Sequence, residues 1–336
     1  MKKVITVIIL TIILSGCANK NNNVKSVETK PPVPMSMFWG LPIGITTAMS
    51  PSLASNLKDN NIDPIIHTDK NINNINFSSV VNDQVLIVSD FIAAIILKDN
   101  LNWRVVGRLN DFRVGVMVPN NSTISQFSDL KNKRICGNIS LVKTLKIKSE
   151  KIGEIPENFI NFSPTDDETI RQTVINAKNG NWKNCDAIIV PDALLSYFQI
   201  KKLGKIIDQD ILVSVIMARN DYIQTNPEVM VDFFQAFSKT LDSFRKNMII
   251  DKKFSVEGMP DDIASQVYHM TYDNEENFNE QALKPLRFYL NKDEIEALQQ
   301  NADMTFDYVT AKPRINVNDY IDVSYAAKAL ERKNNQ

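Results

Sequence analysis

The sequence predicts an α/β fold, because short β-rich runs alternate with segments of helical periodicity from Ser36 onward. Several β-rich runs are continuously apolar, as expected of strands buried on both faces of a parallel sheet. The 336 residues, 43% hydrophobic and 23% charged, have globular composition and allow two domains. The 38 Lys and Arg residues are balanced by 39 Asp and Glu residues. Because a nucleic-acid-binding protein normally has an excess of basic residues, we expect no nucleic-acid partner.

The expected strands follow one another with helical segments between them. They span residues 62–67, 84–88, 103–107, 113–118, 133–137, 158–162, 185–190 and 211–217, after a first strand that ends near Trp39. Ser50-Pro51 predicts the start of the first helix, since Ser is a good N-cap and Pro suits the first helical position. Further helices are expected from Phe91, after a capping box at 165–168, after Asn226-Pro227, over 292–300 and over 320–330.

The helix after Asn226-Pro227 has a conspicuous apolar stripe. Its members recur at helical spacing: Met230, Phe233, Phe234, Phe237, Leu241 and Phe244. Such a stripe indicates core packing rather than a cofactor site.

The N-terminus has the pattern of a secretory signal peptide. Lys2 and Lys3 precede an apolar run at 4–14, which is too short to span a hydrocarbon core that needs about 20 residues. The following sequence LSGC (14–17) resembles the lipobox of bacterial lipoproteins, which implies a signal peptide at 1–16 and lipidation of Cys17, for example by palmitate. Residues 17–34 are rich in Asn, Lys and Pro and are expected to form a flexible tether.

Two further cysteines, Cys136 and Cys185, lie in predicted strands. An exported protein could pair them. Of the two alternatives we favour two separate buried thiols. The sequence itself does not show the connectivity.

Three stretches resemble the type 2 periplasmic-binding-protein fold of substrate-binding lipoproteins, which serve ABC importers for nitrate, sulfonates, taurine and thiamine precursors. They are VGVMV (114–118) with STI (122–124) and DLKNKRI (129–135), then CDAIIVP (185–191), then NPE (226–228) with the Phe-rich helix. Asn132 stands where the family usually has Gly.

The resemblance covers roughly residues 36–330 and implies two lobes, each a mostly parallel sheet flanked by helices. Lobe one would comprise 35–116 and 217–336, and lobe two 117–216. Two crossover strands, near 116–120 and 213–218, would form a hinge that closes around a bound solute. The implied function is an extracytoplasmic receptor that delivers a small molecule to an ABC permease.

Ligands in open α/β sheets bind beyond the carboxyl ends of strands, where helix N-termini offer unpaired N–H groups. This rule selects four loops as candidate ligand contacts: Gly44, Thr46 and Thr47; Ser89 and Asp90; Asn138 and Ser140; and Asp192. Trp39 could stack on a ring-bearing solute. Each polar residue could instead cap a helix, and Trp39 could pack in the core.

The candidate loops contain no Arg, whereas Asp90 and Asp192 could face the solute. Carboxylates would repel an anion across a site of low dielectric constant, which favours a neutral or nitrogen-bearing solute.

Catalytic motifs are scarce. The two histidines, His67 and His269, lie about two hundred residues apart and lack metal-ligand spacing. We therefore expect no catalytic residue, metal or cofactor, although enzymes exist on this fold. A lipoprotein that signals or binds a protein partner is the other alternative. We expect a monomer anchored by lipid outside the cytoplasm, on a Gram-positive outer face or in a Gram-negative periplasm.

Overall fold

The computed structural model describes residues 31–39, 43–67, 82–100, 102–137, 161–164, 182, 185–191, 195, 198–199, 201–251, 288–304 and 314–334. The chain from Pro32 to Gln336 forms one unit, separate from Met1–Pro31.

The described strands form one mixed sheet in the order β2-β1-β3-β8-β4-β7-β5-β6. Their bounds are β1 Val33–Trp39, β2 Ile62–His67, β3 Val85–Ser89, β4 Trp103–Val118, β5 Arg134–Gly137, β6 Asn161–Pro164, β7 Ala187–Pro191 and β8 Lys205–Arg219. Strands β1, β2 and β3 are mutually parallel and are called the β1–β3 group. Strands β5, β6 and β7 are also parallel and are called the β5–β7 group.

Helices lie between and beyond these strands. Their bounds are α1 Ile43–Asp59, α3 Asp90–Asp99, α7 Asn220–Thr225, α8 Pro227–Asp251, α11 Lys292–Met304 and α12 Ser324–Asn334, with short 3-10 helices η2 Phe127–Leu130 and η5 Val317–Tyr320. The alternation of strands and helices confirms the predicted α/β class.

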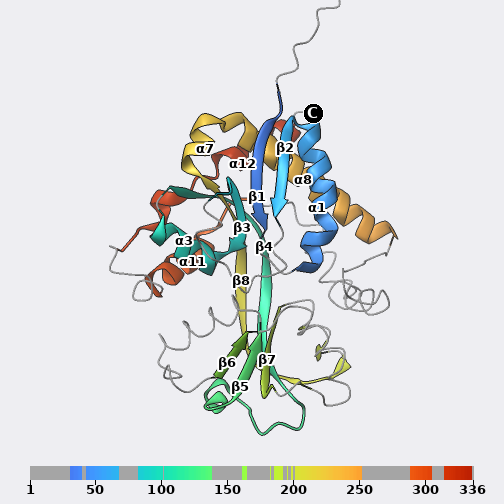
Figure 1. Ribbon diagram of the computed structural model, residues 1–336, viewed down its shortest axis with the longest axis vertical. Helices are drawn as coiled ribbons and strands as arrows, with labels where there is room; N and C mark the ends of the chain where they lie inside the picture. The colour runs from blue at the N-terminus through green and yellow to red at the C-terminus, as the bar shows by residue number, and fades with distance from the viewer. Residues whose placement is uncertain are drawn as a thin grey trace, which may run out of the picture. The chain divides into compact units, whose positions relative to one another are not determined.

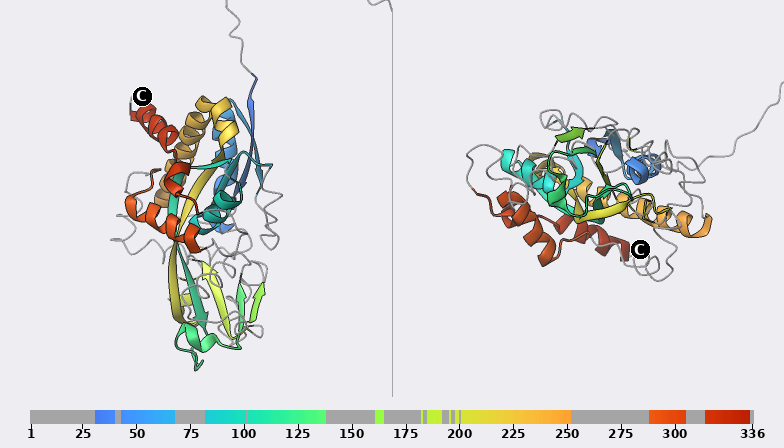
Figure 2. Two further views of the ribbon diagram at one scale, coloured as in Figure 1. Left: turned by 90° about the vertical axis from the view of Figure 1, so that its left-hand side faces the viewer. Right: turned by 90° about the horizontal axis from the view of Figure 1, so that it is seen from below.

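Two long antiparallel strands, β4 and β8, connect the two groups (Figure 1). One part of β8 pairs with β3, and the opposite part of β4 pairs with β7. The pairing of β4 with β8 shifts register at three places: between Val105 and Gly107, between Arg108 and Asp111, and between Val116 and Met117. Such bulges bend a strand and increase its twist. Figure 2 shows from the side how β4 and β8 run from one group to the other.

Several element boundaries differ from the sequence prediction: β6 is displaced by two to three residues from 158–162, β8 begins six residues before 211, and α12 is displaced by four residues from 320–330. The strands expected at 103–107 and 113–118 are one strand, because β4 continues through its polar middle by backbone pairing with β8. Helix α1 begins at Ile43 and contains Pro51, so Ser50-Pro51 does not start it. Pro in a helix interior removes one backbone hydrogen bond and crowds the preceding turn, and packing of the buried Leu53 and Leu57 opposes this cost. Strand β1 begins at Val33, inside the segment predicted as tether.

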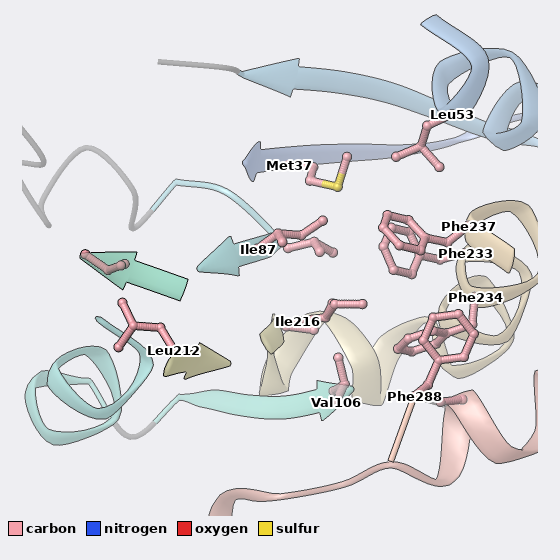
Figure 3. Packing of buried hydrophobic residues seen from close by; sticks show 14 of the residues in the cluster. Met37, Leu53, Ile87, Val106, Leu212, Ile216, Phe233, Phe234, Phe237 and Phe288 are labelled. Carbon is pink, nitrogen blue, oxygen red and sulfur yellow. The ribbon is translucent and has the colours of Figure 1, made fainter. Parts of the chain in front are cut away.

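The larger core lies between the sheet, α1 and α8 (Figure 3). Phe233, Phe234 and Phe237 of α8 are fully buried, as the stripe predicted. The ring of Phe234 meets that of Phe288 at 5.2 Å between centroids, in an edge-to-face arrangement. The side chain of Phe244 lies outside the described residues.

A second core covers the other face of the β1–β3 group. Phe91 of α3 and Leu298 of α11 are fully buried there against strand residues such as Val105 and Val215. The C-terminal part of the chain also covers the edge of β4, since Asp322 donates its amide to the Val105 carbonyl at 2.9 Å.

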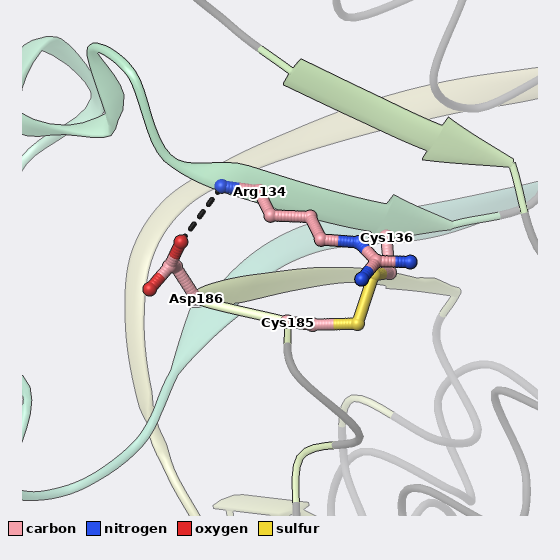
Figure 4. Close-up of a disulfide and its surroundings, with 4 residues drawn as sticks. All are labelled: Arg134, Cys136, Cys185 and Asp186. Atoms are coloured by element: carbon pink, nitrogen blue, oxygen red, sulfur yellow. Dashed lines mark hydrogen bonds between the residues drawn. A yellow bond between two sulfur atoms is a disulfide. The ribbon is translucent and has the colours of Figure 1, made fainter.

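Cys136 and Cys185 form a disulfide (Figure 4). The expectation of two separate thiols is therefore wrong. The two residues are 49 positions apart, but the parallel pairing of β5 with β7 brings their Cα atoms to 5.9 Å, a distance that a disulfide spans readily. Beside it, Asp186 accepts the Arg134 amide at 2.7 Å and adds a second link between the same strands.

Among the residues that the structure describes, no helix is long and apolar enough to cross a membrane.

Candidate functional site

The carboxyl ends of the two parallel groups point toward each other along β4 and β8. β3 ends at Ser89, which pairs with Ser214 of β8. β7 ends at Pro191, which pairs with Val114 of β4, and Val114 in turn pairs with Asp210 of β8. Both groups therefore end near the middle of the long strand pair, where neither β3 nor β7 continues.

The separation between these ends suits a small molecule. The two end points are opposite Asp210 and Ser214 of β8, an offset of four residues that corresponds to about 13 Å along a strand. Helix α3 begins at Asp90, directly after the end of β3, at the end point opposite Ser214.

The first candidate loop is part of a helix. Gly44, Thr46 and Thr47 lie in the first turns of α1, which corrects the expectation of a loop before Ser50. Three residues separate Trp39, the last residue of β1, from the start of the helix. Trp39 pairs in register with Ile87 of β3. The side chains of these candidates lie outside the described part.

Ser89 and Asp90 have structural partners. The Ser89 hydroxyl accepts the Ile92 amide at 3.3 Å and is the N-cap of α3. One Asp90 oxygen accepts the Phe91 amide at 2.9 Å, and the other accepts the side-chain amide of Asn301 at 3.0 Å. Asp90 is 4% exposed. The capping alternative is thus confirmed for Ser89, and the Asp90 carboxylate is occupied by donors from the protein.

Asn138, Ser140 and Asp192 lie outside the described residues. Their neighbours are described: Gly137 ends β5 and Pro191 ends β7. The capping box expected at 165–168 and His269 also lie outside the described part.

Two residues near the strand ends were missed by the sequence analysis. Asn301 lies 211 positions from its partner Asp90, so sequence spacing could not pair them. Ser214 is fully buried opposite Ser89, and its hydroxyl has no hydrogen-bond partner among the described residues. A serine inside the apolar run 211–217 was a visible but unspecific signal.

The stretches that resembled the receptor family have structural roles where they are described. Asp129 accepts hydrogen bonds from the amide and hydroxyl of Ser125 and from the Gln126 amide, and these lower the pKa of its carboxyl. Asn132 has a φ of 60°, which explains why Gly is usual there: both residues tolerate the left-handed region.

Metal ligands do not gather among the described side chains, where no group of three or more His, Cys, Asp or Glu residues forms a site. His67 is exposed and lies 3.7 Å from the Asp83 carboxylate, to which the Ser36 hydroxyl also donates. This contact links β2 to the residues before β3.

Comparison with solved structures identifies the fold. Over 91% of this chain and 96% of the other, the structure matches a protein from Methylobacillus flagellatus assigned as a periplasmic sulfonate-binding protein, with a TM-score of 0.60 and 17% identity. The chain has the periplasmic-binding-protein fold. The periplasmic aliphatic sulphonate binding protein from Escherichia coli matches over 88% of this chain and 99% of its own, with a TM-score of 0.55 and 13% identity. No protein-family model and no curated protein sequence matches the chain.

The same fold occurs in an enzyme. The desulfurization enzyme DSZB matches over 89% of this chain and 99% of its own, with a TM-score of 0.54 and 11% identity. The fold therefore does not by itself separate a receptor from a catalyst.

Proposed function

We propose that the protein is an extracytoplasmic solute-binding receptor of an ABC importer. The observation that carries this proposal is the convergence of two sets of parallel-strand carboxyl ends on one stretch of β8, between Asp210 and Ser214. The solute binds there, between the two groups, and is released unchanged to a membrane permease.

The solute contacts come from α1 and from the loops after β5 and β7. In the β1–β3 group they are Trp39 and the first turns of α1, with Gly44, Thr46 and Thr47. In the β5–β7 group they are Asn138 and Ser140, which follow β5, and Asp192, which follows β7. Ser89 and Asp90 support the site instead, because each already binds protein groups.

The boundary between the lobes lies at the bulge of β4 between Arg108 and Asp111. The part of β4 before it pairs with the same part of β8 as β3, and the part after it pairs with β7. We prefer this boundary to 116/117 because the neighbours of the long strand pair change there from β3 to β7, although the register of β4 with β8 shifts at both places.

The protein is anchored by lipid on Cys17 and held above the membrane by the segment before β1. The disulfide supports a location outside the cytoplasm, where such bonds persist. Replacement Cys17→Ser should move the protein from the membrane fraction to the soluble extract of the native compartment. A protein that stays in the membrane fraction would contradict lipid anchoring.

Thermal unfolding of the protein tests the receptor function. The panel comprises thiamine precursors, polyamines, amino acids, taurine, alkanesulfonates and nitrate. A solute at about 100 times its dissociation constant adds roughly 2.7 kcal/mol to the stability, which corresponds to several degrees. We expect a neutral or nitrogen-bearing compound to shift the transition. No shift with any compound, from folded protein, would favour the alternative of a partner-binding lipoprotein.

Affinity for the solute found in this way tests the role of Asp192. Asp192→Asn should weaken affinity about tenfold or more, because it removes a charged contact with the solute. The control is Asp59→Asn, an exposed aspartate of α1 that lies 3.5 Å from Lys239 and away from the strand ends. A sulfonate or nitrate as the best ligand would refute the inference about solute charge. Chemical conversion of the bound compound, followed by mass spectrometry, would favour an enzyme.

A further inference from the structure

Helix α11 has a polar residue at each end of its buried stripe. Glu294, Leu298 and Asn301 follow one another at spacings of four and three residues, so they share one face. The Glu294 side chain is 10% exposed, Leu298 is fully buried and Asn301 is 4% exposed. An apolar core would not require a carboxylate and an amide on this face, so their partners explain their presence.

At its first end, α11 is joined to the bulge of β4. Arg108 donates from its Nε atom to Glu294 at 2.6 Å, and both side chains are 10% exposed. The Arg108 amide also donates to the Phe288 carbonyl at 2.9 Å. The other Glu294 oxygen accepts the Asn291 amide at 2.8 Å, and the Asn291 side chain caps the Glu294 amide at 2.8 Å. Glu294 is thus fixed to the start of its own helix and to the strand.

At its other end, α11 is joined to the start of α3. Asn301 donates to the Asp90 carboxylate at 3.0 Å, and Asp90 follows Ser89, where β3 ends. Seven residues separate Glu294 from Asn301, which corresponds to about 10 Å along a helix. One rigid element therefore contacts both the end of β3 and the bulge between the two groups.

We propose that α11 couples the carboxyl end of β3 to the bulge of β4, with Asn301 and Glu294 as positioning residues. A displacement at Asp90 moves Asn301, and because the helix is stiff, it also moves Glu294 against Arg108. The role of this coupling in solute-driven closure rests on the proposed function. The coupling itself is a property of the chain without solute, so it can be tested separately.

Amide hydrogen exchange of the full chain without solute tests the coupling. Asn301→Ala should speed exchange of the Arg108 amide about tenfold, although Asn301 lies at the far end of α11. The control is Asn56→Ala: Asn56 is 7% exposed and donates to Thr240 of α8 at 2.8 Å. This control variant loses a similarly buried side-chain amide outside α11. The exchange rate of the Arg108 amide should therefore stay within about twofold of the wild-type rate.

Two further variants keep the result interpretable. The double variant Asp90→Asn with Asn301→Asp re-forms the hydrogen bond with donor and acceptor reversed. Its Arg108 amide should therefore be protected as in the wild type. In the opposite direction, Glu294→Gln should speed exchange of the Phe91 and Ile92 amides, because coupling is reciprocal. This conservative variant serves if Asn301→Ala does not fold.

Local effects alone would overturn the proposal. If Asn301→Ala speeds exchange only near Phe91 and leaves Arg108 protected, and Glu294→Gln acts only near Arg108, the two contacts are independent. A protein that shows the coupling but binds no solute would refute the receptor function and leave the coupling intact. Solute binding without the coupling would refute the coupling and leave the receptor function intact.

Discussion

The β1–β3 group and the β5–β7 group are stabilised in different ways. In the first, strand residues such as Met37 and Ile87 pack against large rings, including Phe233 and Phe237, between two helices and the sheet. In the second, strand residues such as Ile135 and Ile189 are also buried and the rings of Trp182 and Phe198 meet at 5.6 Å between centroids, but here the disulfide also joins neighbouring strands covalently. Apolar burial stabilises the folded state, whereas a disulfide acts mainly by restricting the unfolded chain.

This difference predicts separate responses to mutation in the two groups. A receptor that closes by bending needs two bodies that keep their internal structure while the strands between them move. The two groups meet this need by different physical means, so a change in one should leave the other protected. The following variants test that independence.

Phe234→Ala should have the largest effect. The ring is fully buried and contacts Phe233 at 5.3 Å and Phe288 at 5.2 Å between centroids. Its removal leaves a cavity and should cost about 3–5 kcal/mol in the free energy of unfolding, measured by urea denaturation. Hydrogen exchange should show lost protection in β1 and β3 but not in β5. Phe234→Leu is the control and should cost less; equal losses in both groups would contradict the independence.

Removal of the disulfide should have the next largest effect, in the other group. Cys136→Ala with Cys185→Ala opens a loop of 49 residues and should cost about 2–4 kcal/mol. Limited proteolysis should then cut the β5–β7 group first, while β1 and β3 stay protected. Reduction of the wild-type protein should reproduce this pattern, and reduction of the double variant should change nothing further.

Gly115→Ala should cost about 1–3 kcal/mol by overpacking. A Cβ atom on Gly115 of β4 would lie 2.4 Å from a Leu195 methyl group. Leu195 is fully buried, so its side chain has little room to move away. Urea denaturation of the pair Gly115→Ala with Leu195→Ala checks the cause: the double variant should lose less than the sum of the two single losses. Additive losses would show that the clash is relieved elsewhere.

The short buried strands were predicted well because burial left a pattern in the sequence, whereas β8 begins six residues before its predicted start. β2 coincides with the predicted 62–67, and β3 and β5 differ by one residue at their ends. Continuous apolar runs such as that of β3 are typical of strands that are buried on both faces of a sheet. The polar middle of β4 broke the run, and only the pairing with β8 continues the strand there.

The candidate site was less accessible to sequence reasoning. Ser50-Pro51 is a sound local start signal, yet α1 begins at Ile43, since tertiary packing can override local propensity. Asp90 looked available because its partner Asn301 is 211 positions away. The disulfide was missed for the same reason: pairing depends on the register of β5 and β7, which spacing does not reveal.

Lys202→Gly should have the smallest effect and should stabilise the protein. Lys202 follows Lys201, the last described residue of a helix, and has a φ of 52°, a region that favours Gly. Its carbonyl accepts a hydrogen bond from Asn120, and because this contact uses only the backbone, Gly can keep it. We expect a gain of about 1 kcal/mol, measured by urea denaturation.

Two controls identify the backbone as the cause of that gain. Lys202→Ala keeps the strain and removes the charge, so it should give no gain. Asn132→Gly should give a smaller gain, because Asn tolerates its φ of 60° better than Lys tolerates a similar angle. Equal gains from Lys202→Ala and Lys202→Gly would assign the effect to the side chain. If only the Gly variant gains, and its added protection lies in the β5–β7 group, the two groups are independent even for effects this small.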